Sequence, residues 1–173
     1  MRRSKMTVHK LTLLSMLTAV AMLLSYLESL VPPLVAIPGV KVGFSNIATV
    51  LTLYTLGVPS AIAVSVVRVC LSALLFGNVQ TLFFSLMGAA FALAVMSVMR
   101  TFTPFSEIGV SVAGGVMHNA GQIVAAVIVM ENSAIASFLP PLIITGTLAG
   151  VVVGIVSALL VKRLSSVIAK STR

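Results

Sequence analysis

The residues of this chain that could do chemistry lie within apolar segments, and Arg68 is the most informative of them. On insertion scales, an arginine at the centre of a lipid bilayer costs roughly 2.5–3.5 kcal/mol. Ser65, Arg68 and Ser72 are spaced i, i+3 and i+7, which places them on one face of a helix. A charge kept at this depth usually faces a protein interior or a polar cavity, so we predict that this face helps to bind an anionic molecule.

A second polar stripe is predicted in the apolar segment 108–130. It consists of Ser111, Gly115, His118, Asn119 and Gln122. Lipid cannot satisfy such side chains, so we expect the stripe to face the interior together with Arg68. Two interpretations are open: the polar residues line a substrate cavity, or they hydrogen-bond one another and only hold the helices together.

Acidic residues are scarce, and none is expected near Arg68. The three glutamates, Glu28, Glu107 and Glu131, all lie near the ends of apolar segments. An ion pair inside the membrane is therefore not expected, and Glu28 is expected to approach Lys41 at the outer surface. The chain lacks a carboxylate pair and a phosphate-binding Gly-Lys-Ser/Thr loop, so we predict no enzyme activity and no cofactor.

A metal site is not expected either. His118 has only one other histidine to accompany it, His9, which lies in the N-terminal tail.

The composition of the chain indicates that the elements that position these residues span a membrane. Hydrophobic residues make up 59% of the 173 residues and charged residues 8%, with a mean hydropathy of +1.19. A soluble domain carries about 25% charged residues. Six spans of about 20 residues would use roughly 120 residues, which leaves no room for a soluble catalytic domain.

Proline, glycine and polar residues divide the chain into six predicted transmembrane helices. They cover residues 11–30, 44–56, 60–76, 81–99, 108–130 and 138–161. The second is short for a full crossing, so a tilted or partly re-entrant helix is an alternative. We predict an all-α six-helix transmembrane domain over residues 11–161, flanked by basic cytoplasmic tails at 1–10 and 162–173.

The distribution of basic residues predicts the orientation. Nine of the eleven Lys and Arg residues fall on the side that would hold both termini. By the positive-inside rule, both termini are cytoplasmic in a multi-pass protein of the bacterial cytoplasmic membrane. The basic clusters flank hydrophobic helices, so they indicate contact with the lipid bilayer, and nucleic acid is not an expected partner.

Small residues mark the helix contacts. Gly146, Gly150 and Gly154 recur at every fourth position, and Ser15 with Ala19 forms a weaker version of the same pattern. This spacing lets two helix backbones approach closely. Packing within the bundle and docking of another subunit are both open.

Four segments of the sequence resemble a known family. They are Ile37-Pro-Gly-Val-Lys-Val-Gly-Phe-Ser-Asn-Ile47, Val67-Arg68-Val69, Phe76-Gly77-Asn78 and Gly109-Val-Ser-Val-Ala-Gly-Gly-Val-Met-His-Asn-Ala-Gly-Gln122. They resemble the Gx transporter family, also labelled heptaprenyl diphosphate synthase component I. That family is similar to the substrate-binding (S) components of energy-coupling-factor vitamin transporters, which are six-helix bundles.

The resemblance implies that this chain would bind the substrate and dock to other subunits, which would supply the energy. An outer loop with Lys41 would cover a site beneath it, and a transmembrane coupling subunit and two ATPases would be partners. The predicted substrate-binding residues are Lys41, Asn46, Arg68, Asn78, His118, Asn119 and Gln122. The predicted docking residues are Ser15, Ala19, Gly146, Gly150 and Gly154, although S components usually carry Ala-x-x-x-Ala where this chain has Ser15 and Ala19.

The substrate implied by the resemblance is a small vitamin-like molecule, with a flavin as the first candidate. The alternative is a non-catalytic accessory subunit of an isoprenoid or redox complex. Prenyl diphosphate condensation itself needs clustered aspartates to hold magnesium, and the chain contains no Asp.

Overall fold

The computed structural model describes residues 8–30, 43–102 and 105–171, with side chains as far as residue 164. This part of the chain is helical and contains no strand, which confirms the predicted all-α class. The elements are α1 (Val8–Ser29), α2 (Asn46–Leu56), α3 (Val58–Phe76), α4 (Val79–Phe102), α5 (Glu107–Met130), the 3-10 helix η1 (Ser133–Phe138) and α6 (Leu139–Ser171).

Five described segments are long and apolar enough to cross a membrane. They are α1, α3, α4, α5 and the stretch Ser133–Leu164. Helix α2 has 11 residues and is about 16 Å long, against a hydrocarbon core of about 30 Å, so it is short for a full crossing, as the predicted range 44–56 indicated. The bundle therefore contains six α-helices among the described residues, one of them half-length.

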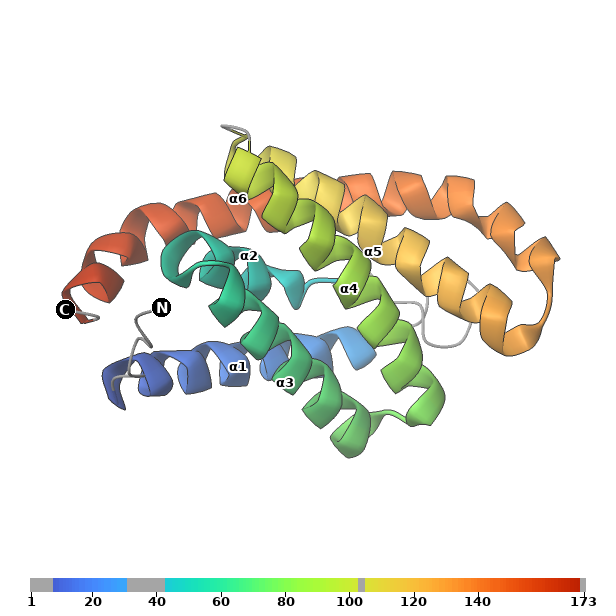
Figure 1. Ribbon diagram of the computed structural model, residues 1–173, viewed down its shortest axis with the longest axis horizontal. Helices are drawn as coiled ribbons and strands as arrows, with labels where there is room; N and C mark the ends of the chain where they lie inside the picture. The colour runs from blue at the N-terminus through green and yellow to red at the C-terminus, as the bar shows by residue number, and fades with distance from the viewer. Residues whose placement is uncertain (1–7, 31–42, 103–104, 172–173) are drawn as a thin grey trace.

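Helices α1 and α6 follow the long axis of the molecule, whereas α3 and α4 cross it obliquely (Figure 1). Helix α5 packs extensively on both α4 and α6, whereas α1 packs mainly on α3. The short α2 contacts α1, α3, α5 and α6, so it lies inside the bundle. The beginning of α1 and the end of α6 lie at the same end of the molecule, at the left of Figure 1.

Local sequence explains where the helices begin. Gly57 takes a positive φ of 83°, and Pro59 occupies the first turn of α3, where a missing N–H costs nothing. Ser106 caps α5, because its side chain accepts a hydrogen bond from the backbone N–H of Gly109. These turns place the polar faces of α3 and α5 inside the bundle.

The contact between α5 and α6 depends on glycine. A Cβ at Gly146 would lie 2.9 Å from the carbonyl oxygen of Gly115, and one at Gly150 would lie 2.6 Å from Cα of Val112. A Cβ at Gly154 would similarly meet backbone of α5. Helix α5 therefore covers these three α6 glycines, as the alternative of packing within the bundle predicts. Docking of another subunit on α6 stays a prediction.

Candidate functional site

Arg68 lies in α3, and its side chain is buried, with 6% of its surface exposed. Its Nη1 donates to the hydroxyl of Ser45, at the start of α2, over 2.5 Å, and reaches that of Ser25 in α1 at 3.5 Å. Among the described residues, neither Nε nor Nη2 of Arg68 has a hydrogen-bond partner. A buried guanidinium with two unused nitrogens is costly, so these atoms identify where a ligand or a water is needed.

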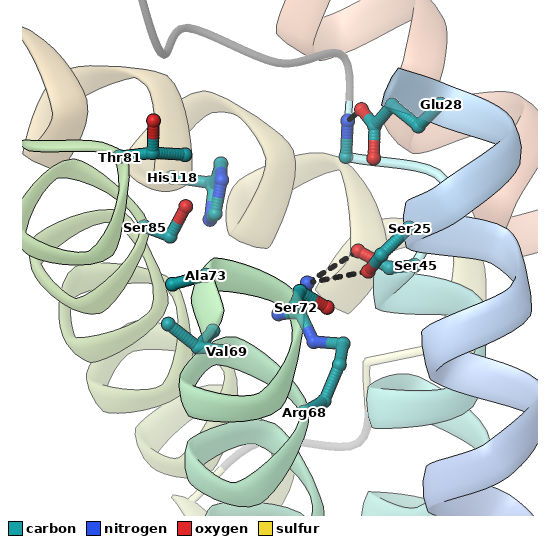
Figure 2. Close-up of a pocket in the computed structure, with 11 residues that line it drawn as sticks. Ser25, Glu28, Ser45, Arg68, Val69, Ser72, Ala73, Thr81, Ser85 and His118 are labelled. Carbon is teal, nitrogen blue, oxygen red and sulfur yellow. Dashed lines mark hydrogen bonds between the residues drawn. The ribbon is translucent and has the colours of Figure 1, made fainter. Parts of the chain in front are cut away.

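Arg68 lines a cavity that five helices or their ends enclose (Figure 2). The cavity volume is about 10 Å³, which is room for about one water molecule. Most of its polar lining is hydroxyl groups, from Ser25, Ser45, Ser72, Thr81 and Ser85. Figure 2 shows Thr81, Ser85 and His118 on one side of the cavity and Ser25 with Ser45 on the other. A serine-rich lining can both donate and accept hydrogen bonds, so it suits a polar ligand.

Glu28 also lines this cavity, which corrects the expectation that no acidic group would lie near Arg68. Its side chain is buried and its charge acts on Arg68. Oε1 of Glu28 accepts a hydrogen bond from the backbone N–H of Gly43, in the turn that leads into α2. The carboxylate of Glu28 therefore has two positive groups beside it, the backbone N–H of Gly43 and the guanidinium on the same cavity.

The polar stripe of α5 divides between two neighbours. His118 lines the Arg68 cavity, as expected for a residue that faces Arg68. Gln122 is fully buried, and its Cγ would lie 3.0 Å from a Cβ placed at Gly88 of α4. Asn119 instead faces α6, where its Nδ2 donates to the carbonyl oxygen of Leu142 over 2.7 Å. The stripe therefore serves both interpretations: His118 lies at the cavity, and Asn119 joins two helices.

The other predicted substrate-binding residues lie elsewhere. Asn46 is buried and lines a second cavity, together with Ser111 and Gly150. Asn78 is exposed, and its Oδ1 accepts hydrogen bonds from the backbone N–H and the hydroxyl of Thr81, at 2.8 and 3.0 Å. It acts as an N-cap of α4. Lys41 lies outside the described residues.

The predicted docking residues of α1, Ser15 and Ala19, are exposed on the bundle surface. The hydroxyl of Ser15 donates to the carbonyl oxygen of Leu11 over 3.0 Å. This internal bond satisfies the hydroxyl on a surface that lipid or another protein would cover.

Sequence reasoning did not identify Glu28 and Ser25 as site residues. Their spacing of i and i+3 was the available signal, because it places both on one face of α1. Ser45, Thr81 and Ser85 carry no comparable signal, since isolated hydroxyls near helix ends are common.

A family model matches most of the chain. The family model described as heptaprenyl diphosphate synthase component I matches residues 17–160, which include all the described residues that line the Arg68 cavity. No curated protein and no solved structure matched the chain.

Proposed function

The chain belongs to the heptaprenyl diphosphate synthase component I family, and from this membership and the site we propose that it is a substrate-binding membrane subunit of a transporter. Its substrate is a small vitamin-like molecule with an anionic group, bound at Arg68. This role resembles that of the S component of an energy-coupling-factor transporter. It requires no catalysis by this chain.

The observation that carries the proposal is the buried guanidinium of Arg68 with its two unused nitrogens. A purely structural arginine in a membrane bundle would be expected to use its donors on carbonyl or carboxylate groups of the protein. Here one nitrogen is held by Ser45 and Ser25, and the remaining two are available to a ligand. His118 and the hydroxyls around it supply further hydrogen bonds.

A whole vitamin is larger than the present cavity, because small-molecule sites usually enclose about 300–1,000 Å³. Binding therefore requires the cavity to widen. Candidate substrates can be tested as a panel of small molecules. A flavin comes first in this panel, because the family resemblance suggests it.

The same proposal includes orientation and partners. The ends of α4 and α6 that carry Arg100, Lys162 and Arg163 would face the cytoplasm. A transmembrane coupling subunit would then dock on α1, whose Ser15 and Ala19 are exposed, and two cytoplasmic ATPases would supply the energy.

Mass spectrometry of the small molecules that co-purify with the protein from native membranes tests this function. We expect a specific anionic compound with the wild type, and its loss with Arg68→Ala. Arg100→Ala is the matched control, because Arg100 is exposed and stacks over the ring of Tyr54, at 4.6 Å. Equal losses of folded protein and of ligand in Arg68→Ala would contradict the proposal, as would a wild type that carries no ligand and is stabilised by none of the panel.

A second candidate function follows from the description of the family. A non-catalytic subunit of a prenyl diphosphate synthase would co-purify with that enzyme and would tolerate Arg68→Ala. Co-purification of the enzyme with both the wild type and Arg68→Ala would favour this function over transport.

A further inference from the structure

The guanidinium of Arg68 also indicates which chemical group the ligand carries. Nη1 is the nitrogen occupied by Ser45 and Ser25, so the unused pair is Nε and Nη2. In an arginine these two nitrogens point parallel N–H bonds along one edge of the plane. This edge binds two oxygens of one carboxylate or phosphate at the same time.

Ser72 supplies a third donor to the same group. It lies one turn after Arg68 in α3, lines the cavity, and is 7% exposed. Its hydroxyl has no hydrogen-bond partner among the described residues. A two-oxygen anion on the Arg68 edge would therefore find an additional hydrogen bond within the cavity.

The charge of the cavity lining favours a carboxylate over a phosphate. Arg68 is the single Lys or Arg among the described residues that line the cavity, and Glu28 lines it too. The ionised Glu28 offsets the guanidinium, so the pair is neutral before a ligand binds. A carboxylate would add one negative charge, whereas a phosphate adds about 1.5–2 at neutral pH. Uncompensated charge is very costly in a buried site, so the second charge of a phosphate is strongly disfavoured.

We propose that the substrate binds through a single carboxylate on the Nε–Nη2 edge of Arg68, and that Glu28 excludes phosphate and diphosphate groups from this cavity. The proposal rests on the function proposed above and narrows its substrate. It excludes prenyl diphosphates and the flavins as ligands of Arg68, since riboflavin carries no carboxylate and flavin mononucleotide carries a phosphate, so a flavin among the co-purified molecules would contradict it. Glu28 is thus a specificity-determining residue, while Arg68 and Ser72 hold the substrate.

Three small probes test the proposal: acetate, its planar and uncharged isostere acetamide, and methyl phosphate, a larger tetrahedral anion. The full chain is purified in lipid nanodiscs, and binding is followed by calorimetry and by the shift of the thermal unfolding midpoint. A pH of 8 keeps methyl phosphate doubly charged, and chloride keeps the ionic strength constant. We expect acetate to bind and to stabilise the wild type, and acetamide and methyl phosphate to do neither.

The variants separate charge exclusion from simple fit. Glu28→Gln keeps the acceptor for the Gly43 N–H but removes the charge, so we expect its Kd for methyl phosphate to fall about tenfold or more. Arg68→Gln should abolish binding of both anions. Glu107→Gln is the control, because this glutamate lies at the start of α5 and does not line the cavity.

The outcomes distinguish the two proposals. Binding of methyl phosphate to the wild type as tight as that of acetate, lost in Arg68→Gln, would overturn the carboxylate proposal and leave the binding function standing. An unchanged preference in Glu28→Gln would overturn the role of Glu28. Absence of binding by either anion to folded wild type, together with no co-purified ligand, would overturn both.

Discussion

Gly88 of α4 lies directly against the imidazole of His118 in α5. A Cβ at residue 88 would lie 2.9 Å from Cε1 and 3.0 Å from Nδ1 of His118, and 3.0 Å from Cγ of Gln122. Such distances are shorter than ordinary van der Waals contacts. Because His118 lines the Arg68 cavity, the absence of a side chain at Gly88 sets where the imidazole can lie.

Gly88→Ala should therefore weaken ligand binding by displacing His118 and Gln122. Extra methyl groups in a packed interior usually cost about 1–3 kcal/mol of stability, and part of this strain would be relieved by rotation of the imidazole. Thermal unfolding and ligand affinity measure the two effects. Gly109→Ala is the matched control, since a Cβ there meets its nearest atoms at 3.7 Å. Unchanged affinity in a folded Gly88→Ala protein would show that His118 does not position the ligand.

Asn119→Leu should destabilise the fold without weakening ligand binding. The side chain of Asn119 donates to the carbonyl oxygen of Leu142 in α6 and does not line the Arg68 cavity. Loss of one hydrogen bond between membrane helices costs about 0.5–2 kcal/mol. The unfolding midpoint should fall while the ligand Kd stays within about threefold, a change of less than 1 kcal/mol. A loss of ligand affinity without a loss of stability would show that Asn119 contributes to ligand binding.

Asn78→Ala tests a residue that the sequence assigned to substrate binding and the structure places at a helix end. Removal of an N-cap costs about 0.5–2 kcal/mol, so stability should fall by that amount. Asn78→Ser should restore most of it, because serine is also a good N-cap. Ligand affinity, measured by calorimetry, should be the same in all three proteins. A loss of affinity in both variants would contradict the capping role.

The sequence predicted the class, the element order and the central residue of the site. Hydropathy and the spacing of polar residues follow directly from burial in lipid, so Arg68 and His118 could both be placed inside the bundle. The short second helix was also predicted nearly to its ends, as residues 44–56 against Asn46–Leu56 in α2.

Two features of the site needed the structure. Glu28 lies two residues before residue 30, where the first helix was expected to end, and this position alone suggested a surface residue. Its burial depends on the turn at Gly43, whose φ of 93° directs the backbone N–H to the carboxylate. The division of the α5 stripe between α4 and α6 likewise depends on which helices pack on either side, and periodicity within one helix cannot determine that.

The glycines of α6 give the clearest test of the packing. A Cβ at Gly150 would lie 2.6 Å from Cα of Val112 and 3.0 Å from the carbonyl oxygen of Ser111. Both are backbone atoms of α5, so the contact cannot be relieved by a change of rotamer. The two helices would have to separate.

Gly150→Ala should therefore destabilise the protein by about 1–3 kcal/mol, although alanine is the better helix former by about 1 kcal/mol. Gly109→Ala, which meets only ordinary contacts, should be neutral or stabilising. Denaturant titration of both variants in detergent micelles gives the comparison, and Gly150→Leu should extend the loss because a larger side chain separates α5 from α6 further. If Gly150→Leu kept wild-type stability and lost only a co-purifying subunit, α6 would be a docking face and the α5–α6 contact described here would be wrong.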